Sequence, residues 1–163
     1  MNADPRVMEY FPRTMTAGES AEGIEKIKTG FGRDGFGWWV VEVHGVTPFA
    51  GFIGISVPGF QTHFTPCVET GWRLAAEYWG NGYATEGARA VVRFGFEKAR
   101  LREIVAFTAV ANSRSRRVME KLGMTYDLRD DFDHPGVPDG HPLKRHVLYR
   151  LTRPATTAAE VRS

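Results

Sequence analysis

The segment from Val68 to Gly87, which reads VETGWRLAAEYWGNGYATEG, constrains the fold of this chain more than any other feature. A strand-forming run stops at the turn Gly80-Asn81-Gly82, and a helix-forming stretch follows directly. Such a junction directs unpaired backbone N–H groups and the positive end of the helix dipole at one point in space. Glycine lets the main chain approach a ligand closely or adopt a positive φ. The segment therefore predicts an anion, such as a phosphate, that is held by backbone groups.

Two well-known phosphate-binding patterns do not explain this turn. The P-loop pattern GxxxxGK[ST] requires a Gly-Lys pair followed by serine or threonine, and the sequence contains none. The dinucleotide-binding pattern GxGxxG requires a third glycine at the position where Thr85 stands. The turn therefore belongs either to a different kind of phosphate site or to a simple helix start.

Length, charge and cysteine content limit the number of domains, the partners and the location. We expect 163 residues to form one domain over residues 1–153, with a disordered tail at 154–163. A formal net charge of +2 argues against nucleic acid as a partner. The sequence has no apolar run that could span a membrane, no apolar signal core at its start, and a single cysteine, Cys67. We therefore expect a soluble cytoplasmic protein without a membrane partner.

Periodicity and turn residues indicate the order of helices and strands. Thr16 and Glu19 form a capping box that starts a helix, which runs toward Lys28 and closes at Gly30 and Gly32. Further helices are predicted over residues 3–11, 84–99 and 113–122, and strands over 38–43, 49–57, 68–76, 103–110, 124–128 and 144–151. This order predicts an α+β fold with a mixed α/β sheet. The strands that start at residues 68 and 103 should be parallel neighbours, because a helix connects them.

Two blocks of the sequence carry a family resemblance. In EYWGNGYATEGAR, the residues Glu77, Gly80 and Gly82 match the pattern (Q/R)xxGx(G/A), with Glu77 at the position where Gln or Arg is commonest. In ANSRSRRVMEKLGM, Asn112 and Ser115 match the pattern NxxSxxxxxKLG. Together, and over about residues 2–154, the chain resembles the GNAT acyltransferase superfamily, specifically its RimJ/RimL-type N-acetyltransferases.

The resemblance implies a GNAT-like acyl-CoA N-acyltransferase fold and acetyl-CoA as the co-substrate. It places the pyrophosphate of coenzyme A against backbone N–H groups of the glycine turn and the helix start, at Gly80, Asn81, Gly82, Tyr83 and Ala84. The strand before the turn pairs with the pantetheine arm through Trp72, Arg73 and Leu74. Asn112 either contacts the pantetheine amide or only caps its helix.

The resemblance also implies the activity. We expect an N-acetyltransferase that moves an acetyl group from acetyl-CoA to a primary amine, by direct attack through a tetrahedral intermediate. The amine belongs to a protein N-terminus, a peptide or a small molecule. The alternative is a catalytically silent module that binds CoA or acyl-CoA.

Acyl transfer to an amine needs an acceptor for the proton of the amine and a donor for the departing thiolate. Glu69, on the strand before the glycine turn, is the candidate base and acts through water. The other interpretation of Glu69 is a carboxylate paired with an arginine on a solvated face. Ser115 is the first candidate for the proton donor, and Tyr126 and Tyr149 are its rivals.

Several other residue groups have weaker assignments. A basic cluster either meets the 3′-phosphate of the cofactor or lies on a solvated helix face, and it consists of Arg114, Arg116 and Arg117. The histidines and Cys67 lack metal-ligand spacing, so we expect no metal, and Cys67 is interpreted as a small apolar filler. The acceptor groove is expected between the N-terminal helices and the loops 58–67 and 129–143, which carry His63, His134 and His141.

The start of the sequence departs from the family pattern. Family members have a β-strand and the first part of a helix before the residues that match NADPRVMEYF. We therefore expect either a misplaced start or a sheet that lacks its first strand. In the second case the strand at residues 38–43 has an unpaired edge, which favours a homodimer.

Overall fold

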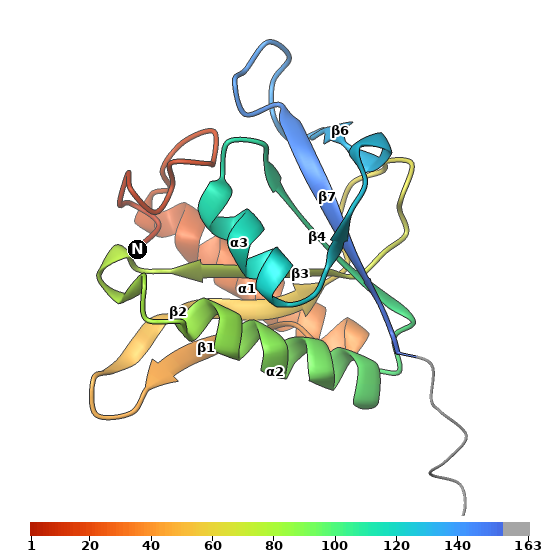
Figure 1. Ribbon diagram of the computed structural model, residues 1–163. Helices are drawn as coiled ribbons and strands as arrows, with labels where there is room; N and C mark the ends of the chain where they lie inside the picture. Colours follow the sequence, from red (N-terminus) through yellow and green to blue (C-terminus); the bar gives the residue numbers. More distant parts are fainter. Residues whose placement is uncertain (155–163) are drawn as a thin grey trace, which may run out of the picture.

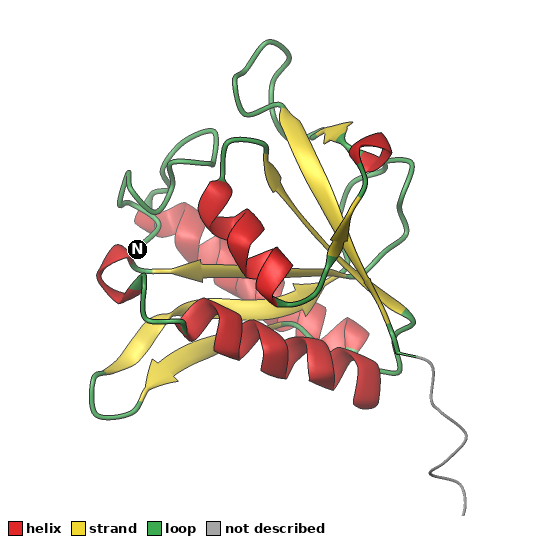
Figure 2. Cartoon of the chain, viewed as in Figure 1, coloured by secondary structure: helices red, strands yellow, loops and turns green. Residues whose placement is uncertain are grey.

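The computed structural model describes residues 1–154, so the predicted tail lies, apart from Pro154, outside the described residues. Figure 2 shows a central sheet with helices on both sides. The helices are α1 (Ala17–Asp34), α2 (Tyr83–Glu97) and α3 (Ser113–Lys121), with two single-turn 3-10 helices, η1 (Ala76–Tyr78) and η2 (Leu128–Asp130). The strands are β1 (Trp38–Val43), β2 (Thr47–Ser56), β3 (Glu69–Leu74), β4 (Glu103–Ala109), β5 (Thr125–Tyr126), β6 (Phe132–Asp133) and β7 (Arg145–Thr152).

One seven-stranded sheet forms the centre of the molecule. The strand order is β1-β2-β3-β4-β7-β5, and β6 also pairs with β7. The pairing of β3 with β4 is parallel, and the other five pairings are antiparallel. Helix α1 covers one face of the sheet, and α2 and α3 cover the other (Figure 1). The predicted α+β fold with a mixed sheet is confirmed, including the parallel strands that start near residues 68 and 103.

Strand β1 forms one edge of this sheet. It pairs with β2 alone among the described residues. The free edge expected for this strand is therefore present, and the side chain of Val40 in the same strand is exposed. The predicted homodimer remains a prediction.

Helix α1 begins and ends at clear local signals. Its capping box is formed as predicted, since the Thr16 hydroxyl accepts from the Glu19 N–H at 3.2 Å and the Glu19 carboxylate accepts from the Thr16 N–H at 2.8 Å. The helix runs through Gly30 and Gly32 to Gly35, which has φ 73° and ends it in the left-handed region. The predicted end at Gly30 and Gly32 was wrong, because a glycine inside a helix costs only about 1 kcal/mol, whereas the left-handed residue stops it.

Two short predicted elements differ in the structure. Residues 3–11 form turns and no helix, with hydrogen bonds from Met8 N to Asp4 O and from Phe11 N to Met8 O. This segment is held by distant contacts, such as the ion pair of Arg114 with Glu9 and the Arg73 guanidinium over the Phe11 ring, and these override local propensity. The strand predicted over 124–128 contains two residues, because the chain turns into η2 and then adds the unpredicted strand β6.

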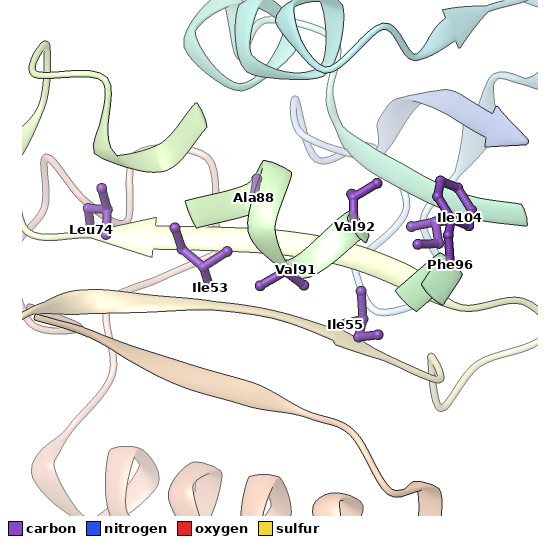
Figure 3. Packing of buried hydrophobic residues seen from close by; sticks show 8 residues of the cluster. All are labelled: Ile53, Ile55, Leu74, Ala88, Val91, Val92, Phe96 and Ile104. Atoms are coloured by element: carbon purple, nitrogen blue, oxygen red, sulfur yellow. The ribbon is translucent and has the colours of Figure 1, made fainter. Parts of the chain in front are cut away.

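The largest part of the core lies between α2 and the sheet. Figure 3 shows side chains from α2 directed at side chains of β2, β3 and β4. The fully or nearly fully buried members of this cluster are Ile53, Ile55, Leu74, Ala88, Val91, Val92, Phe96 and Ile104. This packing fixes the position of the first turn of α2 relative to the end of β3.

The position of two isoleucines relative to the core predicts that their substitution has very different effects on stability. Ile55 is 0% exposed and Ile24 of α1 is 43% exposed. We expect Ile55→Ala to lower the free energy of unfolding by about 2–5 kcal/mol, because it leaves a cavity, and Ile24→Ala to change it by less than about 1 kcal/mol. Urea denaturation of both variants measures this difference. Equal losses in the two variants would contradict the assignment of Ile55 to the core.

Candidate active site

The sheet opens between β3 and β4. These strands are paired at one position only, Glu69 opposite Val105, with a hydrogen bond from Val105 N to Val68 O at 2.9 Å. Beyond Glu69 the two strands diverge (Figure 1). Within the described residues, the backbone of β3 from Gly71 to Leu74 therefore has no partner on the side that faces β4. This divergence leaves strand-type donors and acceptors open toward the interior of the sheet.

The glycine turn at the start of α2 leaves backbone donors open. Gly80 and Gly82 have φ 81° and 85°, which glycine adopts without strain. No side chain caps α2, and its first hydrogen bond runs from Glu86 N to Gly82 O. The N–H groups of the first turn are therefore available to an anion, as the sequence predicted.

Side chains on either side of the turn hold its shape. Trp79 Nε1 donates to Leu74 O at 2.9 Å, and Asn81 Nδ2 donates to the carbonyl oxygens of Tyr78 and Trp79 at 3.3 and 3.1 Å. The Asn81 side chain thus folds back onto the turn and does not line the cavity described next. A contact between its backbone and a ligand remains a prediction.

A cavity of about 760 Å³ joins the glycine turn to the opening between β3 and β4. The N-terminal segment, α1, β3, the start of α2 and the start of α3 contribute to its wall. All predicted site residues except Asn81 line this one cavity, namely Glu69, Trp72, Arg73, Leu74, Gly80, Gly82, Tyr83, Ala84, Asn112 and Ser115. Residues that are up to 46 positions apart in the sequence are therefore brought to one site.

Glu69 is a partly buried carboxyl group at the point where β3 and β4 separate. Its Oε1 accepts a hydrogen bond from Ser56 Oγ at 3.2 Å. Burial raises the pKa of Glu69 to about 7, and the bond from Ser56 acts in the opposite direction. No lysine or arginine forms an ion pair with Glu69 in residues 1–154. The structure therefore contradicts the interpretation of Glu69 as a solvated carboxylate paired with an arginine.

The sequence analysis missed the side chains that orient Glu69. Trp38 Nε1 donates to Ser56 Oγ at 3.2 Å, so β1, β2 and β3 each contribute one member of the chain Trp38–Ser56–Glu69. The Trp38 ring lies across the sheet, and a Cβ placed on Gly71 would come within 2.6 Å of it. The signal was present in the sequence, since Gly54 and Gly71 occupy matching positions beside Trp38 in neighbouring strands.

Asn112 and Ser115 form a local network at the start of α3. Asn112 Oδ1 accepts from Ser115 N at 3.1 Å, and Asn112 Nδ2 donates to Thr108 Oγ1 at 2.9 Å and to Ser115 Oγ at 3.1 Å. The role of Asn112 as a helix cap is confirmed, and its contact with pantetheine remains a prediction. Because Ser115 Oγ accepts the bond from Asn112, its own O–H is left to donate toward the cavity.

The rival proton donors lie elsewhere. Neither Tyr126 nor Tyr149 lines the cavity. The Tyr149 hydroxyl donates to Glu120 Oε1 at 3.3 Å and accepts from Arg116 Nε at 3.4 Å. This arrangement favours Ser115 over both tyrosines as a group that can reach a ligand in the cavity.

The basic cluster is divided between two environments. Arg114 and Arg117 line the cavity together with Lys121. The Arg114 guanidinium lies 4.5 Å from the centre of the Trp79 ring and forms an ion pair with Glu9. Arg116 contacts Tyr149 and does not line the cavity. Two of the three predicted arginines are therefore placed where an anionic ligand could meet them.

Aromatic residues and two histidines close the cavity on the side of β4 and β7. Phe107, His134 and His146 line it, and the ring centres of the histidines are 4.9 Å apart. Burial lowers the pKa of His146 to about 4 and also lowers the pKa of His134, so both rings are neutral near pH 7. Of the three predicted groove histidines only His134 lines the cavity, and the sequence analysis missed His146.

Cys67 lies outside the cavity wall and packs against the cluster around Phe64 and Phe132. Burial raises the pKa of its thiol to about 11, which keeps it protonated. Its interpretation as an apolar filler is confirmed. In residues 1–154 no three side chains of the metal-ligating types come together, and none of the helices there is both long and apolar enough to cross a membrane.

Comparison with known proteins identifies the family. The family model described as "Acetyltransferase (GNAT) domain" matches residues 1–125. The chain is 32% identical to the FsC-acetyl coenzyme A-N(2)-transacetylase of Aspergillus fumigatus, over 96% of this chain and 72% of that protein. It is 33% identical to the protein YkkB of Bacillus subtilis, over 76% of this chain and 70% of that protein. A solved structure of a GNAT-family acetyltransferase from Bacillus anthracis is similar with a TM-score of 0.72 and 26% identity, covering 93% of this chain and 84% of that chain.

The chain belongs to the GNAT acetyltransferase family. It is an acetyl-CoA-dependent acetyltransferase, with acetyl-CoA as the co-substrate that the family uses. The resemblance deduced from the two sequence blocks is therefore confirmed at the level of the family.

The raised pKa of Glu69 makes protein stability depend on pH. Folding shifts this pKa from 4.5 to about 7, so the folded protein binds the proton more tightly than the unfolded chain. This tighter proton binding stabilises the folded protein below pH 4.5, and the stabilisation is lost as the pH rises toward 7. We expect Glu69→Gln to gain stability relative to the parent protein between pH 5 and pH 8, by on the order of 1–3 kcal/mol.

Urea unfolding of both proteins at the two pH values measures this gain. Glu97→Gln is the control, since it removes an exposed carboxylate from α2. A gain of the same size in both variants would contradict the proposed burial cost at Glu69.

Proposed function

We propose that this enzyme is a RimJ/RimL-type N-acetyltransferase, which transfers the acetyl group of acetyl-CoA to a primary amine by direct attack. The acceptor is a protein N-terminus, a peptide or a small molecule. The observation that carries this proposal is the single cavity that contains the open N–H groups of α2, Glu69 and Ser115. The name of the relative from Aspergillus fumigatus, an N(2)-transacetylase, supports an acceptor that is acetylated on nitrogen.

The residues of the cavity fit the two ends of acetyl-CoA. The first turn of α2 offers uncapped N–H groups to the pyrophosphate, at Gly82, Tyr83 and Ala84. The unpaired backbone of β3 offers strand-type hydrogen bonds to the amides of pantetheine, at Trp72, Arg73 and Leu74. Strand β3 runs between Glu69 and the glycine turn. With the pyrophosphate at the turn and pantetheine along β3, the acetyl group would lie near Glu69, where the strands separate.

Glu69 is suited to accept a proton from the attacking amine. A pKa of about 7 leaves roughly half of this carboxyl group ionised at neutral pH. An α-amine has a pKa of about 8, so the proton affinities of donor and acceptor are closely matched. Ser56 and, through it, Trp38 hold the carboxyl group in place.

Ser115 is the proposed donor to the thiolate. Its Oγ is held by Asn112 and its O–H is not used in that bond. Donation of this hydrogen to the sulfur would stabilise the leaving group when the tetrahedral intermediate collapses.

We also propose that residues 1–153 act as one catalytic domain. The single cysteine of the sequence is compatible with a protein that works in a reducing cytoplasm.

The role of Glu69 predicts a pH-dependent rate. A general base acts in its ionised form, so kcat/KM should rise with pH through about pH 7, where Glu69 loses its proton. We expect Glu69→Gln to lower kcat about 100-fold or more and to abolish the rise near pH 7, while CoA binding is retained. Release of free thiol from acetyl-CoA with a panel of amines measures the rate, and calorimetry measures CoA binding.

Two serine variants complete this experiment. Ser115→Ala should lower kcat by a smaller factor, about tenfold, and should keep the rise near pH 7. Ser113→Ala, in the exposed first position of α3, should leave both kcat and the pH profile unchanged. An unaltered pH profile in Glu69→Gln would show that another group accepts the proton.

A substitution in the glycine turn should weaken CoA binding, and this effect can be separated from the loss of stability caused by backbone strain. Gly82 and Gly123 have φ 85° and 79°, and a Cβ would meet no atom within 4 Å at either position. Each change to alanine should therefore cost about 1 kcal/mol of stability through the left-handed backbone alone. Only Gly82→Ala should also weaken CoA binding, about tenfold, because the turn relaxes and its N–H groups move.

Calorimetric titration with CoA, together with thermal unfolding of each variant, separates the two effects. Equal CoA affinity in both variants would show that the glycine turn does not bind CoA.

A further inference from the structure

Arg73 carries a partly buried positive charge that no carboxylate of the described residues neutralises. Its Nη1 donates to Asn2 Oδ1 at 3.1 Å and lies 3.9 Å from the sulfur of Met15. The Phe11 ring covers the guanidinium at 4.2 Å. Nε is buried without a hydrogen-bond partner, and no carboxylate lies within 4 Å of the guanidinium in the described part of the chain.

This arrangement is unfavourable without a ligand. Removing a guanidinium from water is costly unless a counter-ion or a full set of acceptors replaces the water. The three groups around Arg73 are neutral, and together they satisfy only one of its nitrogens. Burial lowers the pKa of Arg73 accordingly. The contacts to Asn2 and Phe11 orient the side chain, but they provide no negative charge.

Glu69 and Arg73 face the same cavity from the same strand. Side chains alternate along a strand, so these two residues and Gly71 lie on the face opposite to Leu74, which packs against α2. The Cα atoms of Glu69 and Arg73 are about 13 Å apart for a rise of about 3.3 Å per residue. The two side chains do not pair with each other, since Glu69 is bonded to Ser56 and Arg73 to Asn2. The cavity therefore has a carboxyl group at one position and a guanidinium at another.

We propose that Arg73 binds a carboxylate of the acceptor, so that the acceptor is an amino acid or a short peptide whose amine lies beside Glu69. This inference rests on the proposed N-acetyltransferase function and specifies its substrate class. A dipolar molecule with an amine at one end and a carboxylate at the other matches the two separated charges of the cavity. The planar guanidinium fork binds a carboxylate with two parallel hydrogen bonds, which a neutral amide cannot reproduce.

The phosphates of coenzyme A do not explain Arg73. The pyrophosphate site proposed above lies at the first turn of α2, and three further cavity cations, Arg114, Arg117 and Lys121, belong to α3. The Arg73 side chain projects to the face of β3 opposite to α2, among residues of the N-terminal segment. The Arg73 side chain and helix α2 therefore lie on opposite faces of β3.

Matched acceptors test the proposal on the unmodified enzyme. The first pair is alanylalanine and alanylalanine amide, and the second is ε-aminocaproate and hexylamine. We expect kcat/KM to favour the carboxylate member of at least one pair by about tenfold or more, mainly through KM. A series of shorter and longer ω-amino acids then locates the separation between amine and carboxylate that fits best.

Variants of two arginines connect the preference to Arg73. Arg73→Gln should remove the preference for the carboxylate, and Arg73→Lys should keep part of it, because a lysine supplies charge without the fork. Arg6→Gln is the matched control, since Arg6 also lines the cavity but already forms an ion pair with Asp4 at 2.7 Å. The preference should persist in the control.

A binding measurement keeps the test independent of turnover and of the folding of the variants. Calorimetry with hexanoate and with hexanol, in the presence of CoA, should detect binding of hexanoate only. Equal kcat/KM for the two members of both acceptor pairs, or equal binding of hexanoate and hexanol, would overturn the proposal while leaving the acetyltransferase function intact. Absence of transfer to any amine of the panel would instead overturn the proposed function and this inference with it.

Discussion

The divergence of β3 from β4 after one paired position is the feature on which the remainder of the site depends. Strand backbones in the middle of a sheet normally satisfy each other, and an unpaired stretch there is unfavourable. In this protein the opening begins beside Glu69 and is flanked by the starts of α2 and α3. A co-substrate that offers amides to β3 and phosphates to α2 would restore the missing hydrogen bonds. In the function proposed above, the acceptor would approach the same opening from the opposite face, and both substrates would meet where the sheet separates.

The parts of the fold and site that the sequence could predict are those set by neighbouring residues. The Gly80-Asn81-Gly82 turn, the capping box at Thr16 and the network between Asn112 and Ser115 all arise within four positions along the chain. Local rules for backbone conformation and capping apply directly at such distances. The order of the main helices and strands followed for the same reason. The parallel pairing of β3 and β4 followed from the helix that connects them.

The remaining features depend on contacts between distant segments, and local patterns do not encode them. The fold of residues 3–11 is one case, because Arg73 and Arg114 bind that segment from other elements. The neutral pair His134 and His146 is another, since it forms only when β6 and β7 come together. The isolation of Arg73 from every carboxylate in residues 1–154 was also invisible, because a charge can be called unpaired only after its surroundings are known.

The chain Trp38–Ser56–Glu69 connects the candidate base to the edge of the sheet. Strand β1 is supported by one neighbour in the described residues, whereas β3 is supported on both sides near Glu69. Edge strands open locally at a lower free energy than the interior of a sheet. Brief opening of β1 would withdraw the indole from Ser56 and leave the carboxyl group free to rotate, while the core stayed folded. Heating would then inactivate this enzyme below the temperature at which it unfolds, and the stability of the edge strand β1 would set the temperature at which activity is lost.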